Sequence, residues 1–222
     1  GQTRTLTGLL LIVGPILSFI VWAILSPAIV GSGETVPETL QLIMDNQVAW
    51  SILGTIGTLC FAGTFVGFGL LSVAMRGEGK PGAAFAAAAV FLFAALTGVL
   101  IANTGLQIGA VEAANQSHHG GLEAGVPILA VGQAIGAGIP TFWGVASILL
   151  GLAMWLRASH RPEGQINVRS ALGAVLAVAG VLLFLGTFIP WDDTPVPIVV
   201  WLAMTITVVG IGITTLRVKE AS

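Results

Sequence analysis

Six long apolar runs separated by short polar stretches constrain what this chain can fold into. Each run is close to or above the roughly 20 residues that a helix needs to cross a bilayer. Only helices and closed barrels satisfy every backbone hydrogen bond in lipid, and runs that are continuous rather than alternating in polarity favour helices. We therefore predict one all-α domain over residues 1–222, a polytopic transmembrane bundle with helices at about 6–30, 47–75, 82–114, 126–157, 169–190 and 196–216.

The composition agrees with a membrane protein and argues against several other classes. The 222 residues are 55% apolar and only 8% charged, whereas soluble globular domains are about 25% charged. The net charge is −2 and no basic cluster exists, so a nucleic-acid partner is not expected. Cys60 is the single cysteine, which excludes an intramolecular disulfide. The expected partner is the lipid bilayer.

The basic residues predict how the bundle is oriented. With six helices, all eight lysines and arginines fall on one side of the membrane, and the opposite loops contain none. The positive-inside rule then places both termini in the cytoplasm, in a multi-pass protein of the cell's inner or plasma membrane. These residues are Arg4, Arg76, Lys80, Arg157, Arg161, Arg169, Arg217 and Lys219.

The first span and the loop after it need separate consideration. The run 6–30 has the charged start of a signal peptide, but it exceeds the roughly 7–15 residues of a signal-peptide core, so we predict a retained transmembrane helix. Residues 31–46 form a loop with a short helix opened by Pro37. In that helix Leu40, Ile43 and Met44 share one face, as expected of an element at the membrane surface.

Amides and hydroxyls gather in three of the predicted spans. In the second span four polar residues recur at spacings of four, four and three, which places them on one helical face. The predicted topology puts them at a depth similar to that of two amides in the third span and one in the fourth. Either they line a polar cavity open to the outside, or they hydrogen-bond neighbouring helices together. The candidate ligand-binding residues are Gln47, Ser51, Thr55, Thr58, Asn103, Gln107 and Gln133.

A pair of histidines lies in the polar loop between the third and fourth spans. His118 and His119 have Glu112 and Glu123 nearby in sequence, and imidazole with carboxylate suits zinc or copper. Adjacent histidines in an extended loop point in different directions, however, and no helical pair of histidines is present. A solvated loop without a metal or other cofactor is therefore favoured, and a zinc or copper site is the alternative.

Catalytic motifs are absent from the sequence. It contains no Gly-x-Ser-x-Gly elbow, no His-Glu-x-x-His motif and no phosphate-binding loop. No charged residue lies in the middle of a predicted span, so a proton or sodium relay lacks its usual carboxylate. A role other than enzymatic is favoured, and coupled transport is disfavoured.

The overall plan resembles that of small six-helix bacterial membrane proteins of uncharacterised role. The features that carry the resemblance are Asp45-Asn46 before the second span, Arg76 at its end and Asn103 in the third span. They cover about the first half of the chain. The resemblance implies a six-helix fold and assigns no functional residue.

Three functional hypotheses remain open. The first is a membrane protein that binds or passes a small polar or amphipathic molecule in an outward-facing cavity. The second is a structural or accessory subunit of a larger complex or a homo-oligomer, whose small residues face other subunits. Gly132, Gly136 and Gly144 recur at helical spacing, and Gly173 and Ala177 form another small pair, with Gly180 on the same face. The third is a metal-dependent membrane enzyme that uses His118 and His119.

Overall fold

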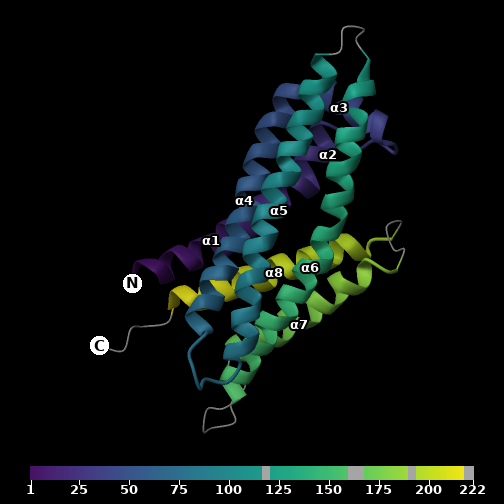
Figure 1. Cartoon of the computed structure of the whole chain (residues 1–222). Helices are drawn as coiled ribbons and strands as arrows, with labels where there is room; N and C mark the ends of the chain where they lie inside the picture. The colour runs from purple at the N-terminus through teal and green to yellow at the C-terminus, as the bar shows by residue number, and fades with distance from the viewer. Residues whose placement is uncertain (117–120, 160–167, 190–193, 218–222) are drawn as a thin grey trace.

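The computed structural model describes residues 1–116, 121–159, 168–189 and 194–217, and these residues form helices joined by turns and short loops, with no strand among them (Figure 1). It contains six helical spans that are long and apolar enough to cross a membrane. The elements in chain order are α1 (Gln2–Phe19), η1 (Ile20–Leu25), α2 (Ser26–Ile29), α3 (Val36–Asp45), α4 (Gln47–Met75), α5 (Ala83–Asn115), η2 (Leu122–Ala124), α6 (Val126–Ser159), α7 (Val168–Gly186) and α8 (Val196–Arg217).

The predicted all-α class and the six spans are confirmed, and most helix ends agree closely with the prediction. The exceptions are the first span, which begins at Gln2 rather than near residue 6, and the fifth span, which ends at Gly186 rather than near residue 190. Past Gly186 the chain tightens into a turn, in which the Thr187 N–H donates to the Phe184 carbonyl and the Phe188 N–H to the Leu185 carbonyl. Glycine is a weak helix former, so a helix readily ends there.

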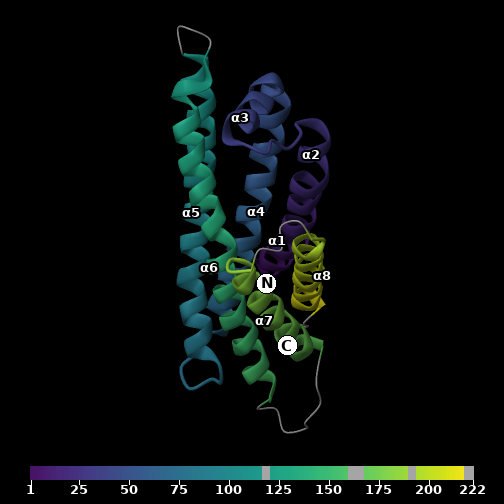
Figure 2. The ribbon, with the colours of Figure 1, turned by 90° about the vertical axis from the view of Figure 1, so that its right-hand side faces the viewer.

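The six spans form a closed ring in chain order. α4 packs against α1, and each later span packs against the one before it. The ring closes because α8 also packs against α1 (Figures 1 and 2). Every span therefore has one face toward a common interior, and this arrangement allows residues from all parts of the chain to meet there.

The closest helix contact in the ring lies between α6 and α7. A Cβ built on Gly144 would come within 2.6 Å of the Gly180 carbonyl oxygen, and one on Gly180 would come equally near the Gly144 carbonyl. Two turns further along, Gly151 and Gly173 face each other in the same way. Small residues allow such close backbone approach in membrane helices.

The first span is a continuous helical segment with a π-helical turn in its middle. Pro15 lies inside α1, and the six-residue π-helix η1 follows. Pro27 comes directly after η1, at the start of α2. A proline ring crowds the carbonyl four residues before it, and a wider turn relieves that crowding. Pro27 crowds the carbonyl of Ala23 inside η1 and thus accounts for the irregular turn, whereas Pro15 acts on the carbonyl of Leu11, before η1 begins.

One end of the ring carries every basic side chain in the described part of the chain. Arg157 at the end of α6 donates to the carbonyl of Met75 at the end of α4, with N···O 2.9 Å. Arg169 at the start of α7 donates to Thr215 near the end of α8. We call this end the basic end; its described members are Arg4, Arg76, Lys80, Arg157, Arg169 and Arg217.

The opposite end is closed on one side by α3. Thr35 and Glu38 form a capping box that begins this helix. Leu40 and Ile43 are buried against a core that α4, α5 and α6 contribute to, while Met44 packs at its edge. The face predicted from the sequence is therefore the buried one, and Figure 2 shows α3 beside α2 and α4 at this end of the molecule.

Large apolar side chains cover the outside of the ring. Phe91 is 74% exposed and Ile206 is 64% exposed, and many leucines, isoleucines and valines on the outer faces are similarly open. A soluble monomer rarely exposes so much contiguous apolar surface. The outer surface is consistent with an integral membrane protein whose ring is surrounded by lipid.

Candidate functional site

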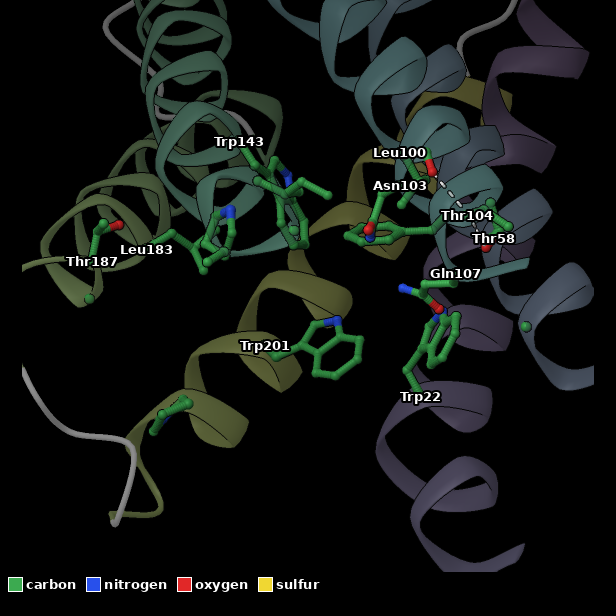
Figure 3. Close-up of a pocket in the computed structure, with 18 of the residues that line it drawn as sticks. Trp22, Thr58, Leu100, Asn103, Thr104, Gln107, Trp143, Leu183, Thr187 and Trp201 are labelled. Carbon is green, nitrogen blue, oxygen red and sulfur yellow. Dashed lines mark hydrogen bonds between the residues drawn. The ribbon is translucent and has the colours of Figure 1, made fainter. Parts of the chain in front are cut away.

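A cavity of about 830 Å³ lies inside the ring and is partly open to the outside of the protein (Figure 3). It is bordered by η1 and by α4, α5, α6, α7 and α8. On the side toward the basic end, the main hydrophobic core closes it, and Leu100, Ile139 and Trp143 belong to both the core and the lining. The cavity therefore lies in the half of the ring remote from the basic residues.

Hydroxyls and amides from two neighbouring helices form the polar wall of the cavity. Ser51, Thr55 and Thr58 line it from α4, as do Asn103, Thr104 and Gln107 from α5. The Thr58 and Thr104 hydroxyl oxygens are 3.0 Å apart. Because Thr104 donates its proton to the Leu100 carbonyl, Thr58 is the donor in this pair. That bond connects α4 to α5 at the level of the cavity.

Asn103 lies against two glycines of α6. A Cβ on Gly132 would come 3.3 Å from Asn103 Oδ1, and a Cβ on Gly136 would come 3.2 Å from Asn103 Nδ2. The glycines thus leave room for the amide between α5 and α6. Asn103 Oδ1 is buried and has no hydrogen-bond partner within the described part of the chain. An unpaired buried acceptor costs about 1–3 kcal/mol, which a bound molecule or water can offset.

Tryptophans supply the aromatic part of the lining. Four of the chain's six tryptophans line the cavity: Trp22, Trp50, Trp143 and Trp201. Figure 3 shows Trp22 and Trp201 bordering the space into which Asn103 and Gln107 project from α5. Such rings offer large apolar faces together with one N–H donor each.

The position of Trp22 depends on local backbone features of two helices. Trp22 belongs to the π-helix η1, and π-helical turns are frequent at functional sites. Its indole lies over Gly57 of α4, where a Cβ would come 2.6 Å from Trp22 Nε1. A larger residue at position 57 would displace the indole toward the cavity.

Trp143 forms part of the floor. Its ring makes edge contacts with Phe61 and Phe65 of α4, at centroid distances of 5.2 and 5.7 Å. The side chain is only 7% exposed, and its Nε1–H has no described hydrogen-bond partner. A second buried polar atom at the cavity is therefore unpaired, this one a donor.

The remaining candidate residues lie elsewhere. Gln47 and Gln133 are exposed and are not part of the cavity lining. Gln47 is the first residue of α4, one turn beyond the lining. Gln133 follows Gly132, so the rotation of about 100° per residue along a helix turns it away from the face that Asn103 contacts.

The metal hypothesis falls on residues that the structure does not describe. His118 and His119 lie within 117–120, outside the described residues. Within the described ranges, no three His, Cys, Asp or Glu side chains gather closely enough to hold a metal ion. The zinc or copper alternative thus stays a prediction from the sequence.

The sequence argument missed the aromatic part of the lining and Thr104. A signal for two of the tryptophans is present, because Trp22 follows Gly14-Pro15 and Trp143 follows Gly138-Ile139-Pro140. Helix breaks of this kind often lie beside functional sites in membrane proteins. Thr104 lies next to Asn103 but belongs to the face toward Thr58, and that pairing depends on which helices are neighbours.

The described lining carries no charged side chain. It combines indoles, hydroxyls and two amides, which can hydrogen-bond to a ligand but cannot neutralise a full charge. The geometry is suited to binding an uncharged molecule with an apolar part. It offers no described nucleophile paired with a base.

Comparison with known proteins finds no matching family model, no similar curated protein and no similar solved structure.

Proposed function

We propose that the protein binds a small uncharged amphipathic molecule in the cavity inside its helical ring. The observation that carries this proposal is the lining itself, in which Asn103, Gln107 and Thr55 share the cavity with four indoles and no described charge is present. A volume of about 830 Å³ falls within the range of roughly 300–1,000 Å³ that is typical of small-molecule sites. Under the positive-inside rule, the cavity opens on the side opposite the cytoplasm.

The tryptophans provide a direct assay. A short-chain 1-acylglycerol with bromine on its acyl chain is uncharged, offers hydroxyls to the amides and quenches indole fluorescence on contact. We expect saturable quenching of the purified protein, because four of six tryptophans border the cavity. Asn103→Leu should raise the Kd about three- to tenfold, the equivalent of one hydrogen bond. Quenching that rises without saturation would refute the proposal.

Gln133→Leu is the matched control. It makes the same chemical change at an exposed amide outside the lining, so it should leave the Kd unchanged. If Asn103→Leu instead lowers stability and leaves the Kd unchanged, its amide only joins helices, which is the alternative expected from the sequence.

A second candidate function, as a subunit of a larger assembly or homo-oligomer, is favoured by one face of α5. Gly98 and Gly105 are exposed there, and a Cβ on either would meet nothing within 4 Å. Small residues on an outer face permit close approach of another transmembrane helix. In a Cys60→Ser background, oxidation of Gly98→Cys in native membranes should give a disulfide-linked dimer. A monomer under all oxidising conditions would rule out a symmetric contact at Gly98.

A further inference from the structure

Most hydroxyls buried in the spans are bonded within their own helix. Thr7, Thr64 and Thr97, for example, donate to the carbonyl four residues earlier, at distances of 2.8 to 3.1 Å. This local bond is the usual solution for serine and threonine in lipid, where no water is available. Thr104, Thr207 and Thr215 show the same bond, and Ser18 and Thr214 donate to the carbonyl three residues earlier.

Three buried hydroxyls depart from this pattern. Ser72 and Ser147 are 0% exposed and Thr205 is 8% exposed, yet none has a hydrogen-bond partner among the described residues. An unpaired buried hydroxyl costs about 1–3 kcal/mol. A bound water or solute molecule can supply the hydrogen bond that each of these hydroxyls lacks in this conformation.

Two of these hydroxyls lie directly below the cavity. Ser147 follows Trp143 by four residues on α6, and Thr205 follows Trp201 by four residues on α8. Both tryptophans line the cavity. Residues four apart share a helical face, so each hydroxyl lies about one turn closer to the basic end than the cavity wall.

The third hydroxyl continues the series on α4. Ser72 follows Phe68 by four residues and Phe65 by seven, and these phenylalanines face the interior against Phe93 of α5. Ser72 is only three residues from Met75, the last residue of α4. Together with the unpaired Trp143 Nε1–H, the three hydroxyls lie on α4, α6 and α8 at successive depths between the cavity floor and the basic end.

We propose that the cavity continues as a closed route for small uncharged polar molecules, which passes Trp143, Ser147, Thr205 and Ser72 on its way to the basic end. The inference rests on the proposed function, since it assigns a path to molecules that enter the cavity. Phe65, Phe68 and Phe93, all 0% exposed, fill the interior and hold the route closed in this conformation. The route can open only if these phenylalanine rings move. Water or solute in the open route then supplies the hydrogen-bond partners that the hydroxyls lack.

Cysteine substitution tests the route without knowledge of the natural solute. In a Cys60→Ala background, Ser147→Cys and Ser72→Cys replace a hydroxyl by a thiol of similar size, so folding should be retained. The probe is iodoacetamide, which is small and uncharged and reacts only with the thiolate, a form that requires local water. Ala146→Cys is the matched control, because Ala146 is also 0% exposed and is adjacent on α6.

We expect iodoacetamide to modify Ser147→Cys and Ser72→Cys at least about tenfold faster than Ala146→Cys in proteoliposomes. Equal rates at the three positions would overturn the route. Thr55→Cys tests separately whether the cavity itself admits iodoacetamide, because Thr55 is an exposed residue of the cavity lining. Fast modification of Thr55→Cys together with slow modification of Ser147→Cys and Ser72→Cys would show that the cavity is accessible but that no route leads from it to the basic end. Slow modification at all of these positions rejects the proposed function as well.

Discussion

The contact between α6 and α7 makes Gly180→Ala a stringent test of the structure. A Cβ at position 180 would lie 2.6 Å from the Gly144 carbonyl oxygen and 2.9 Å from the Ile148 nitrogen. Ordinary van der Waals contact begins near 3.4 Å, so the helices must separate by about 0.8 Å at this point. Both opposing atoms belong to backbone, and no side-chain rotation can relieve the overlap.

The expected energy follows from two opposing effects. Forced overpacking of a well-packed contact costs about 1–3 kcal/mol. The alanine methyl also favours the helix over glycine by roughly 0.5–1 kcal/mol. The net loss should therefore be about 1–2 kcal/mol. Because Gly151 and Gly173 form a second close contact on the same pair of helices, separation at Gly180 also weakens that contact.

The assay is equilibrium unfolding in mixed micelles, followed by far-UV circular dichroism. Gly69→Ala is the control, because a Cβ on Gly69 of α4 would meet nothing within 4 Å. The control should be neutral or slightly stabilising, and the difference between the two variants removes the helix-propensity effect. A Gly180→Ala protein as stable as the Gly69→Ala protein would show that α6 and α7 are not packed this closely.

Three further predictions concern the loops. Ser32→Cys should react with an impermeant maleimide from outside, and Glu78→Cys only after permeabilisation, because both side chains are exposed in loops at opposite ends of the ring; reaction of both from one side would contradict the topology. Changing His118 and His119 to alanine should alter the free energy of unfolding by less than about 1 kcal/mol, as expected for surface positions, whereas a large loss accompanied by loss of metal would favour the metal alternative. Thr35→Ala removes the acceptor for the Glu38 N–H and should cost about 1 kcal/mol in the same assay, while Thr35→Ser should retain it.

The fold could be predicted from the sequence because lipid imposes simple rules. A backbone in hydrocarbon must be helical, and charged residues must leave it, so the spans follow from where apolar runs begin and end. The early end of α7 was missed because Phe188 and Ile189 continue the apolar run beyond Gly186. In that segment hydropathy carries no information about where the hydrogen bonding changes.

The candidate site was predicted only in part, for geometric reasons. Helical spacing correctly groups Ser51, Thr55 and Thr58, and separately Asn103 and Gln107, because each group lies on one helix. Spacing cannot say which helices are neighbours or how each is rotated about its axis. Gln133 has a suitable depth but an unsuitable rotation, and Trp201 comes from the opposite side of the ring.

The order of the helices around the ring has a consequence for how the protein is made. Every contact between adjacent spans except that of α1 with α8 joins segments that emerge one after the other, so helices can pack pairwise during insertion. The last contact brings Gly8 against Gly212 across almost the whole chain, and it can form only after α8 has been synthesised. Until then Trp22 and Trp143 face a gap in the ring. A nascent chain that stalls before Val196 would present this gap to membrane lipid and to quality-control proteases, whereas α8, once inserted, covers it.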